Sequence, residues 1–198
     1  LYKGIAKCNY LISNMDRAID KVNQAKFDQI KSEARFLRSL YYHYLIELYG
    51  GVPLLTEPLS LSNSQVARNS KEEVVDFIIN ELDESAAHLP EQNNPLLGRA
   101  TQGAHWALLS RVALYNQRWN EAIVAAQKVM DLEGTEYVID PDYESLFGYE
   151  GQDSKEVIFS LQYLRGHLVH AVYEQHATRL GKGFANWAPT YQTADSWE

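Results

Sequence analysis

Cysteine is almost absent from this sequence of 198 residues, which contains only Cys8. One cysteine cannot form a disulfide within the chain, so a disulfide-stapled fold is excluded. Cys8 itself lies on the apolar stripe of a helical segment, where we expect it to be a small buried hydrophobe. Long apolar runs are also missing, because no stretch approaches the roughly 20 residues of a membrane-spanning helix. The sequence has no Gly-x-Ser-x-Gly elbow, His-Glu-x-x-His pair or phosphate-binding loop.

Positive charge is scarce, since the sequence has 18 Lys and Arg but 26 Asp and Glu, and the net charge is -8. Residues 1–50 carry 8 Lys and Arg against 5 Asp and Glu, but this excess lies on helical sequence and is expected to be solvated. Nucleic-acid binding depends on neutralising many phosphates with basic side chains. The composition therefore argues against a nucleic-acid partner.

Apolar residues make up 45% of the sequence and charged residues 22%, as in ordinary folded proteins. Aromatic residues reach 12%, and 13 of them are tyrosine. Tyrosine joins an apolar ring to a polar tip, so it suits both helix packing and sugar-binding faces. Four tyrosines fall within residues 41–49, a single helical segment, and we expect them to be packing residues.

Apolar residues recur at intervals of three and four in several segments, which is the helical period. We expect helices over residues 2–18, 23–49, 71–88, 101–116 and 120–134. Gly50 and Gly51 followed by Pro53 end the second helix, because glycine suits the helix C-cap and proline forbids continuation. Ser70 and Glu73 form a capping box at the start of the third.

Residues 135–198 differ in character and contain turns, several glycines and irregular sequence. The run EVIFSL at 156–161 is the one convincing strand pattern. We therefore divide the chain into a helical region, residues 1–134, and an irregular loop region, residues 135–198, with a short strand near 156–161. The predicted fold is mostly α, with long loops and little β.

The last two expected helices are joined by a very short turn at 117–119, which predicts an antiparallel hairpin. Their spacing of small and large residues resembles the tetratricopeptide (TPR) pattern, with Trp106, Leu109, Ser110, Ala113, Ala122, Ala126 and Val129 at the matching positions. Trp106 and Trp119 are expected to pack within this hairpin. The resemblance implies TPR-like antiparallel helix pairs, an α-α superhelix, and by itself fits a TPR-type protein-interaction scaffold.

A more specific resemblance is carried by ordered segments. These are EARFLRSLYY at 33–42, LYGGVPL at 48–54, GRAT at 98–101, EVIFSLQY at 156–163, PT at 189–190 and DSWE at 195–198. In this order they resemble the SusD/RagB family of outer-membrane nutrient-binding lipoproteins from Bacteroidetes-type bacteria. The resemblance covers essentially the whole sequence, and it implies that the chain continues into a further C-terminal part.

The SusD/RagB resemblance implies a non-catalytic protein that captures an oligosaccharide or other nutrient for a SusC-like TonB-dependent transporter. It also implies a cell-surface position on the bacterial outer membrane, with a lipid anchor on a cysteine upstream of Leu1. In this family the TPR-like helices chiefly face the transporter, and the glycan site is built largely from loops and from the C-terminal half. No cofactor is implied.

Candidate sugar-binding residues lie in two irregular segments, the tail and the 52–69 loop. Sugar rings offer apolar faces to flat aromatic rings and hydroxyl groups to amides and guanidinium groups. The candidates are Asn186, Trp187 and Tyr191 in the tail and Asn63 and Arg68 in the loop. The alternative interpretation is that Trp187 packs the tail onto the helices and that the loop residues are simply solvated.

A metal site and a catalytic site are weaker interpretations. His167, His170 and His176 have a spacing that matches no strong zinc signature, so we predict no metal site. A helical glycoside hydrolase, the third alternative, would need two carboxylates facing across a cleft. Residues 72–73 are explained by the helix start and residues 83–84 by an exposed helix face.

Overall fold

The structure, a computed structural model, describes residues 1–60, 65–91, 98–148, 151 and 154–163. The chain divides into two compact units, Leu1–Ser160 and Leu161–Glu198. Every helix that the structure describes belongs to the first unit. The boundary between the units therefore lies later than the change in composition near residue 135.

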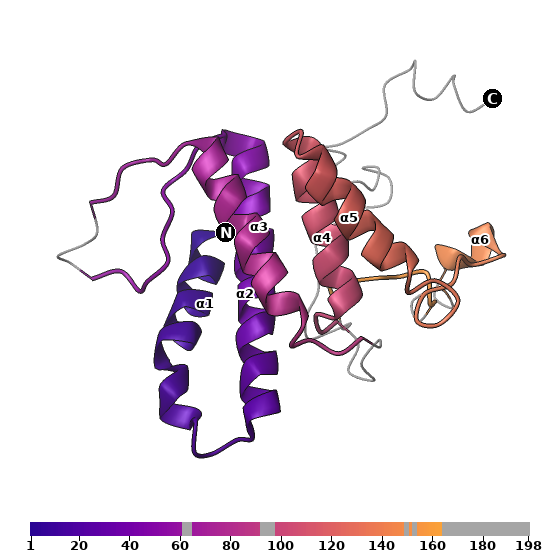
Figure 1. Cartoon of the computed structure of the whole chain (residues 1–198), viewed down its shortest axis with the longest axis horizontal. Coiled ribbons are helices and arrows are strands. Elements are labelled where there is room, and N and C mark those ends of the chain that lie inside the picture. Colours follow the sequence, from indigo (N-terminus) through magenta and orange to yellow (C-terminus); the bar gives the residue numbers. More distant parts are fainter. Residues whose placement is uncertain (61–64, 92–97, 149–150, 152–153, 164–198) are drawn as a thin grey trace, which may run out of the picture. The chain divides into compact units, whose positions relative to one another are not determined.

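All five predicted helices form, and each packs against the next along the chain (Figure 1). They are α1 (Tyr2–Asn14), α2 (Gln24–Tyr49), α3 (Lys71–Ala86), α4 (Gln102–Tyr115) and α5 (Trp119–Met130). Two short elements complete the described set, the 3-10 helix η1 (Met15–Ala18) and α6 (Tyr143–Leu146). The mostly helical, TPR-like fold predicted from the sequence is confirmed, although α5 ends about one turn before the expected residue 134.

Local sequence sets where these helices begin and end. The Ser70 hydroxyl accepts from the Glu73 backbone N–H at 3.2 Å, and the Glu73 carboxylate accepts from the Ser70 backbone N–H at 2.8 Å. This reciprocal capping box is the one predicted from the sequence. Helix α4 begins in the same way, with the Thr101 hydroxyl accepting from the Ala104 N–H at 3.2 Å. Gly50 ends α2 with a φ of 68°, a conformation that favours glycine.

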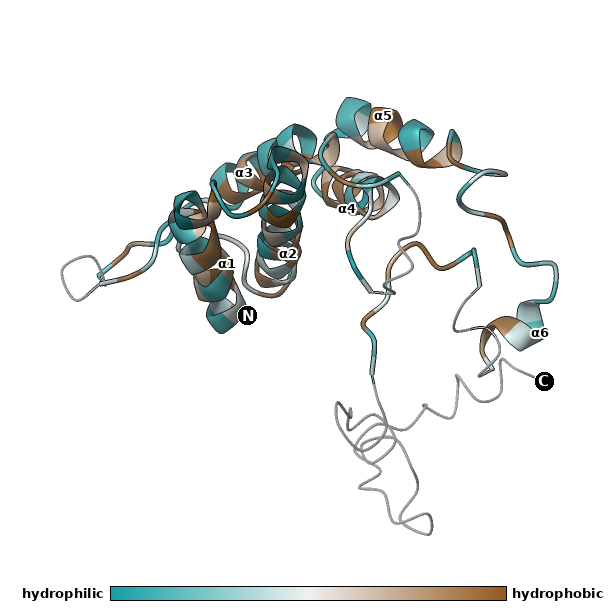
Figure 2. Ribbon diagram, turned by 90° about the horizontal axis from the view of Figure 1, so that it is seen from below, coloured by the Kyte–Doolittle hydropathy of each residue, from teal (hydrophilic) through white to brown (hydrophobic). Residues whose placement is uncertain are grey.

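The core of the first unit lies between successive helices. Its fully buried side chains include Ile5, Phe36, Tyr42, Ile46, Val74, Ile78, Leu82 and Val112. Cys8 is also buried, as predicted. Both hydrophilic and hydrophobic residues lie on helices α1–α5, as amphipathic packing requires (Figure 2). Among the tyrosines expected to pack, Tyr42 does so, but Tyr44 and Tyr49 are 47% and 63% exposed.

Residues 156–161, which the structure describes, do not form the strand that their sequence predicts. A strand needs a neighbouring strand to pair with, and the described residues contain no strand beside this segment. Ile158 and Phe159 pack against the helical core instead, with the Phe159 ring edge-on to Phe36. The apolar run therefore contributes to helix packing and not to a sheet.

Candidate functional site

The base of the loop after α2 is fixed by polar side chains from α1 and α2. The Tyr2 hydroxyl donates to the Pro53 carbonyl at 2.9 Å, and the Asn9 amide donates to the Leu55 carbonyl at 2.8 Å. The Tyr42 hydroxyl accepts from the Leu55 N–H at 2.7 Å and donates to the Leu55 carbonyl at 3.0 Å. Burial raises the pKa of Tyr42 to about 12, so this hydroxyl keeps its proton and can do both.

A buried charge network lies beneath the same loop. Arg38 and Glu81 are 4% and 6% exposed, and their side chains form an ion pair between α2 and α3. The Arg38 guanidinium also donates to the Asn9 side-chain oxygen at 2.7 Å and to the Thr56 carbonyl at 3.3 Å. Arg35 contacts the second oxygen of Glu81 at 3.0 Å. The network thus connects α1, α2, α3 and the loop, and its central members Asn9, Arg38 and Glu81 are buried.

Arg68, the candidate sugar-binding residue that the structure describes, anchors the other end of this loop. Its guanidinium donates to the Tyr49 and Gly51 carbonyls, both at 2.7 Å. These carbonyls lie at the C-terminal end of α2, where the helix dipole favours a cation. Arg68 is exposed to solvent. It therefore holds the end of the loop and also remains accessible to a ligand.

The other four candidates from the sequence, Asn63, Asn186, Trp187 and Tyr191, lie outside the described residues. Nothing in the described part of the chain therefore brings the predicted sugar-binding set together. Arg68 is placed by the structure, and the remaining residues stay a prediction. His167, His170 and His176 also lie outside the described residues.

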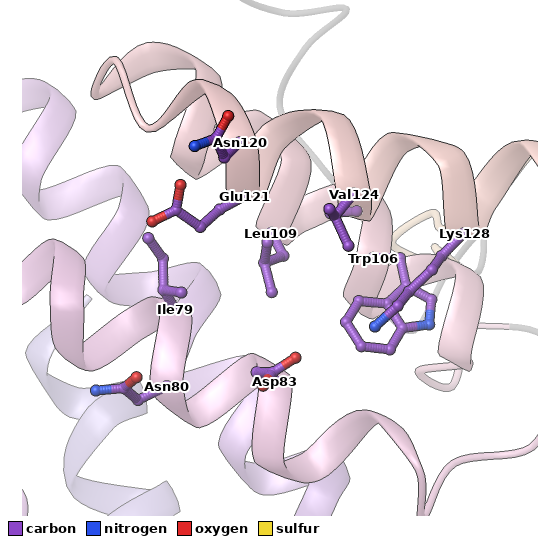
Figure 3. Close-up of a pocket in the computed structure, with 10 residues that line it drawn as sticks. Ile79, Asn80, Asp83, Trp106, Leu109, Asn120, Glu121, Val124 and Lys128 are labelled. Carbon is purple, nitrogen blue, oxygen red and sulfur yellow. The ribbon is translucent and has the colours of Figure 1, made fainter.

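A concave site in the described part of the chain is an open pocket of about 270 Å³ that helices α3, α4 and α5 line (Figure 3). Its apolar wall comes from Ile79, Leu109, Val124, Ala125 and the Trp106 ring, and its polar groups come from Asn80, Asp83, Asn120, Glu121 and Lys128. We refer to it as the α3–α5 pocket. An apolar wall with a few polar side chains is the usual makeup of a small-molecule site.

A cation lies over the aromatic ring of the α3–α5 pocket. The Lys128 ammonium is 3.5 Å from the centroid of the Trp106 ring (Figure 3). A cation–π contact at a partly exposed site contributes about 0.5–1 kcal/mol, so it orients the two side chains without locking them. Trp106 packs partly on the core, as predicted, but Trp119 is 56% exposed and does not pack within the hairpin.

Serine and histidine also meet, but in the interior of the first unit. Ser85 and His105 are both fully buried, with 3.0 Å between the Ser85 hydroxyl oxygen and His105 Nε2. The His105 ring stacks on Phe36 at 4.8 Å, and burial lowers its pKa to about 3, so the imidazole is neutral. No substrate can reach this pair in the folded state. Among the described residues, no three His, Cys, Asp or Glu side chains gather as a metal site would require.

A sequence model described as "Starch-binding associating with outer membrane", SusD-like, matches residues 1–114, more than half of the chain. The chain belongs to the SusD-like family. The resemblance seen in the ordered segments is thereby confirmed, and the TPR-like helical fold is the fold of this family. None of the helices described here has the length and apolar character needed to cross a membrane.

Individual SusD-like proteins are similar over much of the chain. A SusD-like protein of Bacteroides ovatus is 28% identical over 82% of this chain, and the starch-binding protein SusD of Bacteroides thetaiotaomicron is 28% identical over 65%. These matches cover 32% and 23% of the two relatives. The chain thus spans about a third of the length of the B. ovatus protein, so its helices correspond to one part of a SusD-like protein.

Solved structures agree with this assignment. A SusD-like carbohydrate-binding protein of Bacteroides fragilis superposes with a TM-score of 0.82 at 27% identity, covering 93% of this chain and 36% of that protein. A laminarin-binding SusD-like protein gives a TM-score of 0.74 at 28% identity, covering 80% and 35%. The helical arrangement described above is therefore the one found in SusD-like proteins of known structure.

The α3–α5 pocket is the feature that sequence reasoning missed in this SusD-like chain. In the sequence, the TPR-like pattern accounts for Trp106 as a packing residue, and the exposed face of a helix accounts for Asp83. The signal that could have found it is the position of Trp106 and Lys128 on neighbouring antiparallel helices, at equal distance from the turn at 117. Pairing the hairpin residue by residue would have placed the two side chains opposite each other.

Proposed function

We propose that this chain is part of a non-catalytic glycan-binding component of a bacterial outer-membrane uptake system. The protein captures an oligosaccharide at the cell surface and passes it to a SusC-like TonB-dependent transporter. The match of residues 1–114 to a starch-binding, outer-membrane-associated family is the observation that carries this proposal. Two structural relatives whose names record carbohydrate or laminarin binding support it.

The surface position follows from the same family. We propose that a lipid-modified cysteine upstream of Leu1 anchors the protein to the outer membrane. Cys8 does not serve this purpose, because its thiol is buried within the helical core. A lipid must reach the bilayer, and a buried side chain of α1 cannot carry it there without unfolding the helix.

A binding role fits the described carboxylates better than hydrolysis does. The α3–α5 pocket contains two carboxylates, Asp83 and Glu121, which are the candidates for a catalytic pair under the hydrolase alternative. Both side chains are exposed to solvent. The acid catalyst of a glycosidase needs an apolar, desolvated surrounding that keeps it protonated near neutral pH. Exposure removes that condition, and the pair is better suited to accept hydrogen bonds from hydroxyl groups.

The outer face of α5 supports a protein partner. Trp119, Ile123 and Met130 follow each other at helical spacing on one face, and they are 56%, 67% and 60% exposed. We propose that this face contributes to docking on the SusC-like transporter. The general TPR-type scaffold, the alternative function, would instead bind a peptide or helix in the concave face of the helix pairs.

Affinity electrophoresis of the full-length protein through gels containing starch, laminarin and other polysaccharides tests the proposal. We expect at least one neutral glycan to retard the protein, and we expect no new reducing ends after long incubation. Retardation together with release of reducing ends would favour the hydrolase. If no glycan retards the protein, and a protein other than the transporter co-purifies with it, the scaffold is favoured.

Transporter association is tested separately by co-purification from outer membranes. The double variant Trp119→Ser and Ile123→Ser should lose the transporter while keeping glycan retardation. Ala6→Ser and Ala87→Ser, at exposed helical positions of α1 and the end of α3, provide a control with unchanged co-purification. Equal recovery of the transporter with both double variants would contradict the docking face.

A further inference from the structure

The α3–α5 pocket has properties that packing alone does not explain. It lies entirely on helices, whereas the residues predicted to bind sugar come from the 52–69 loop and the tail. A half-buried tryptophan ring, two amides and two carboxylates line one space of about 270 Å³. The pocket is open to solvent, because Asn80, Asp83 and Val124 are exposed, so a ligand can enter it from outside.

The charges of the pocket select against ionic ligands. An anionic ligand would meet the exposed carboxylates of Asp83 and Glu121. A cationic ligand would compete with the Lys128 ammonium, which already lies over the Trp106 ring. A neutral ligand with both donor and acceptor groups avoids both conflicts. It can donate to the carboxylates and accept from the ammonium and the amides.

The shape of the lining favours a ring with one apolar face. Leu109, Val124 and the Trp106 ring line one side of the pocket, Asp83 lies across from them on α3, and the Glu121 carboxylate lies near Ile79 at the rim (Figure 3). A pyranose ring has apolar C–H faces and hydroxyl groups around its edge. Such a ring packs its face on the apolar wall and directs its edge toward the amides and carboxylates. The volume suits one or two sugar units, near the lower end of small-molecule sites.

We propose that the α3–α5 pocket is a carbohydrate subsite that takes one or two units of a neutral oligosaccharide, with Trp106 as the stacking platform. Glu121 and Asp83 accept hydrogen bonds from its hydroxyl groups. The Lys128 ammonium moves off the ring face as the sugar arrives and becomes a donor to it. This inference rests on the proposed glycan-binding function and adds a site on the helices to the one expected in the loops.

The backbone of the subsite is preorganised in the unbound protein. All ten lining residues lie on three helices that pack on one another, so the backbone of the site is fixed by the core. The side chain that must move for a ring to stack on Trp106 is Lys128, whose contact with the ring is weak. Sites on rigid elements lose little conformational entropy on binding.

The experiment uses full-length protein labelled with 5-fluorotryptophan and titrated with laminarihexaose and with maltohexaose. The fluorine resonance of Trp106 is assigned as the one missing in Trp106→Phe. We expect at least one of the two oligosaccharides to shift this resonance in a saturable way. The Trp119 resonance, assigned through Trp119→Phe, should stay in place, because that residue is not part of the pocket.

Matched variants then measure the contribution of each group by titration calorimetry. Trp106→Ala should raise the dissociation constant at least about tenfold, since a stacked aromatic supplies much of the apolar contact. Glu121→Gln should raise it about threefold to tenfold, because the amide oxygen still accepts a hydrogen bond but a neutral one is weaker than a charged one. Trp119→Ala and Glu72→Gln are the controls, since Glu72, like Glu121, lies in the first turn of its helix. Both controls should bind as the parent does.

The possible failures are distinguishable. If the parent protein binds neither these nor any other neutral glycan, the proposed function fails, and the subsite fails with it. If the parent binds but the Trp106 resonance does not move, or Trp106→Ala and Glu121→Gln bind like their controls, the subsite alone is wrong. Trp106→Phe and Glu121→Gln keep the test decisive if Trp106→Ala does not fold, as judged by circular dichroism. Stronger binding of oligogalacturonide, a charged comparator, than of the neutral sugars would also overturn the proposal.

Discussion

Replacing Glu81 by alanine removes the carboxylate that faces two guanidinium groups in the interior of the helical unit. Arg38 would then keep the Asn9 side-chain oxygen and the Thr56 carbonyl as hydrogen-bond acceptors, neither of them charged, while staying 4% exposed. Breaking a buried ion pair in this way typically costs about 3–5 kcal/mol, because one charge is left without compensation. Glu81→Gln retains an acceptor of the same shape and should cost about 1.5–3 kcal/mol.

Glu84 provides the matched control one turn along α3. It pairs with Arg35 at 2.9 Å, but its side chain is 64% exposed, so Glu84→Ala should cost at most about 1 kcal/mol. A double variant, Arg38→Met with Glu81→Leu, should recover most of the loss, since an apolar pair needs no compensation. Urea unfolding followed by circular dichroism at 222 nm gives the free energies. Equal losses for Glu81→Ala and Glu84→Ala, or no recovery in the double variant, would refute the reasoning.

Three further predictions concern local stability. Ser70→Ala should cost about 1 kcal/mol through the lost capping box with Glu73, and an unchanged urea midpoint would count against it. The pKa of His105 is about 3 when folded and near 6.5 when unfolded, so the unfolded state binds the extra proton. Stability should therefore fall as the pH decreases from about 6.5 toward 3, by up to about 1.4 kcal/mol per unit. His105→Gln should flatten this dependence of the melting temperature, and an equal pH response in both proteins would be the contrary result. Gly51→Ala should cost about 1–3 kcal/mol, because the new methyl group would collide with the Asn69 carbonyl oxygen, and an unchanged melting temperature would rule out that close approach.

The helices were predictable because their signals are local. Ser70 and Glu73 define a start, Gly50 and Pro53 define an end, and the apolar period supplies the faces between them. These signals act within a few residues of each other, so reading the chain in order is enough. The family resemblance was also accessible, since it depends on the order of short segments.

Features that depend on contacts between distant residues were not predictable in the same way. The buried position of Arg38 depends on Glu81 and Asn9, each more than 25 residues away, and the sequence shows only a charge on a helix. The run at 156–161 has strand composition, but a strand also requires a partner, which the pattern cannot supply. Tyr49 is expected from the sequence to pack with the other tyrosines of its segment, yet it is the last residue of α2 and is 63% exposed.

The fixed base of the loop after α2 has a consequence for how SusD-like proteins diversify. Residues 53–57 are held by Tyr2, Asn9, Arg38 and Tyr42, and the far end is held by Arg68. Between these anchors, lengthening the loop costs the fold little, because each doubling of its length adds only about 0.6 kcal/mol. Selection can therefore change the length of this loop from one lineage to another as the available polysaccharide changes. The anchoring residues, by contrast, hold the loop to the helices, so insertions and deletions should fall between residue 57 and Arg68.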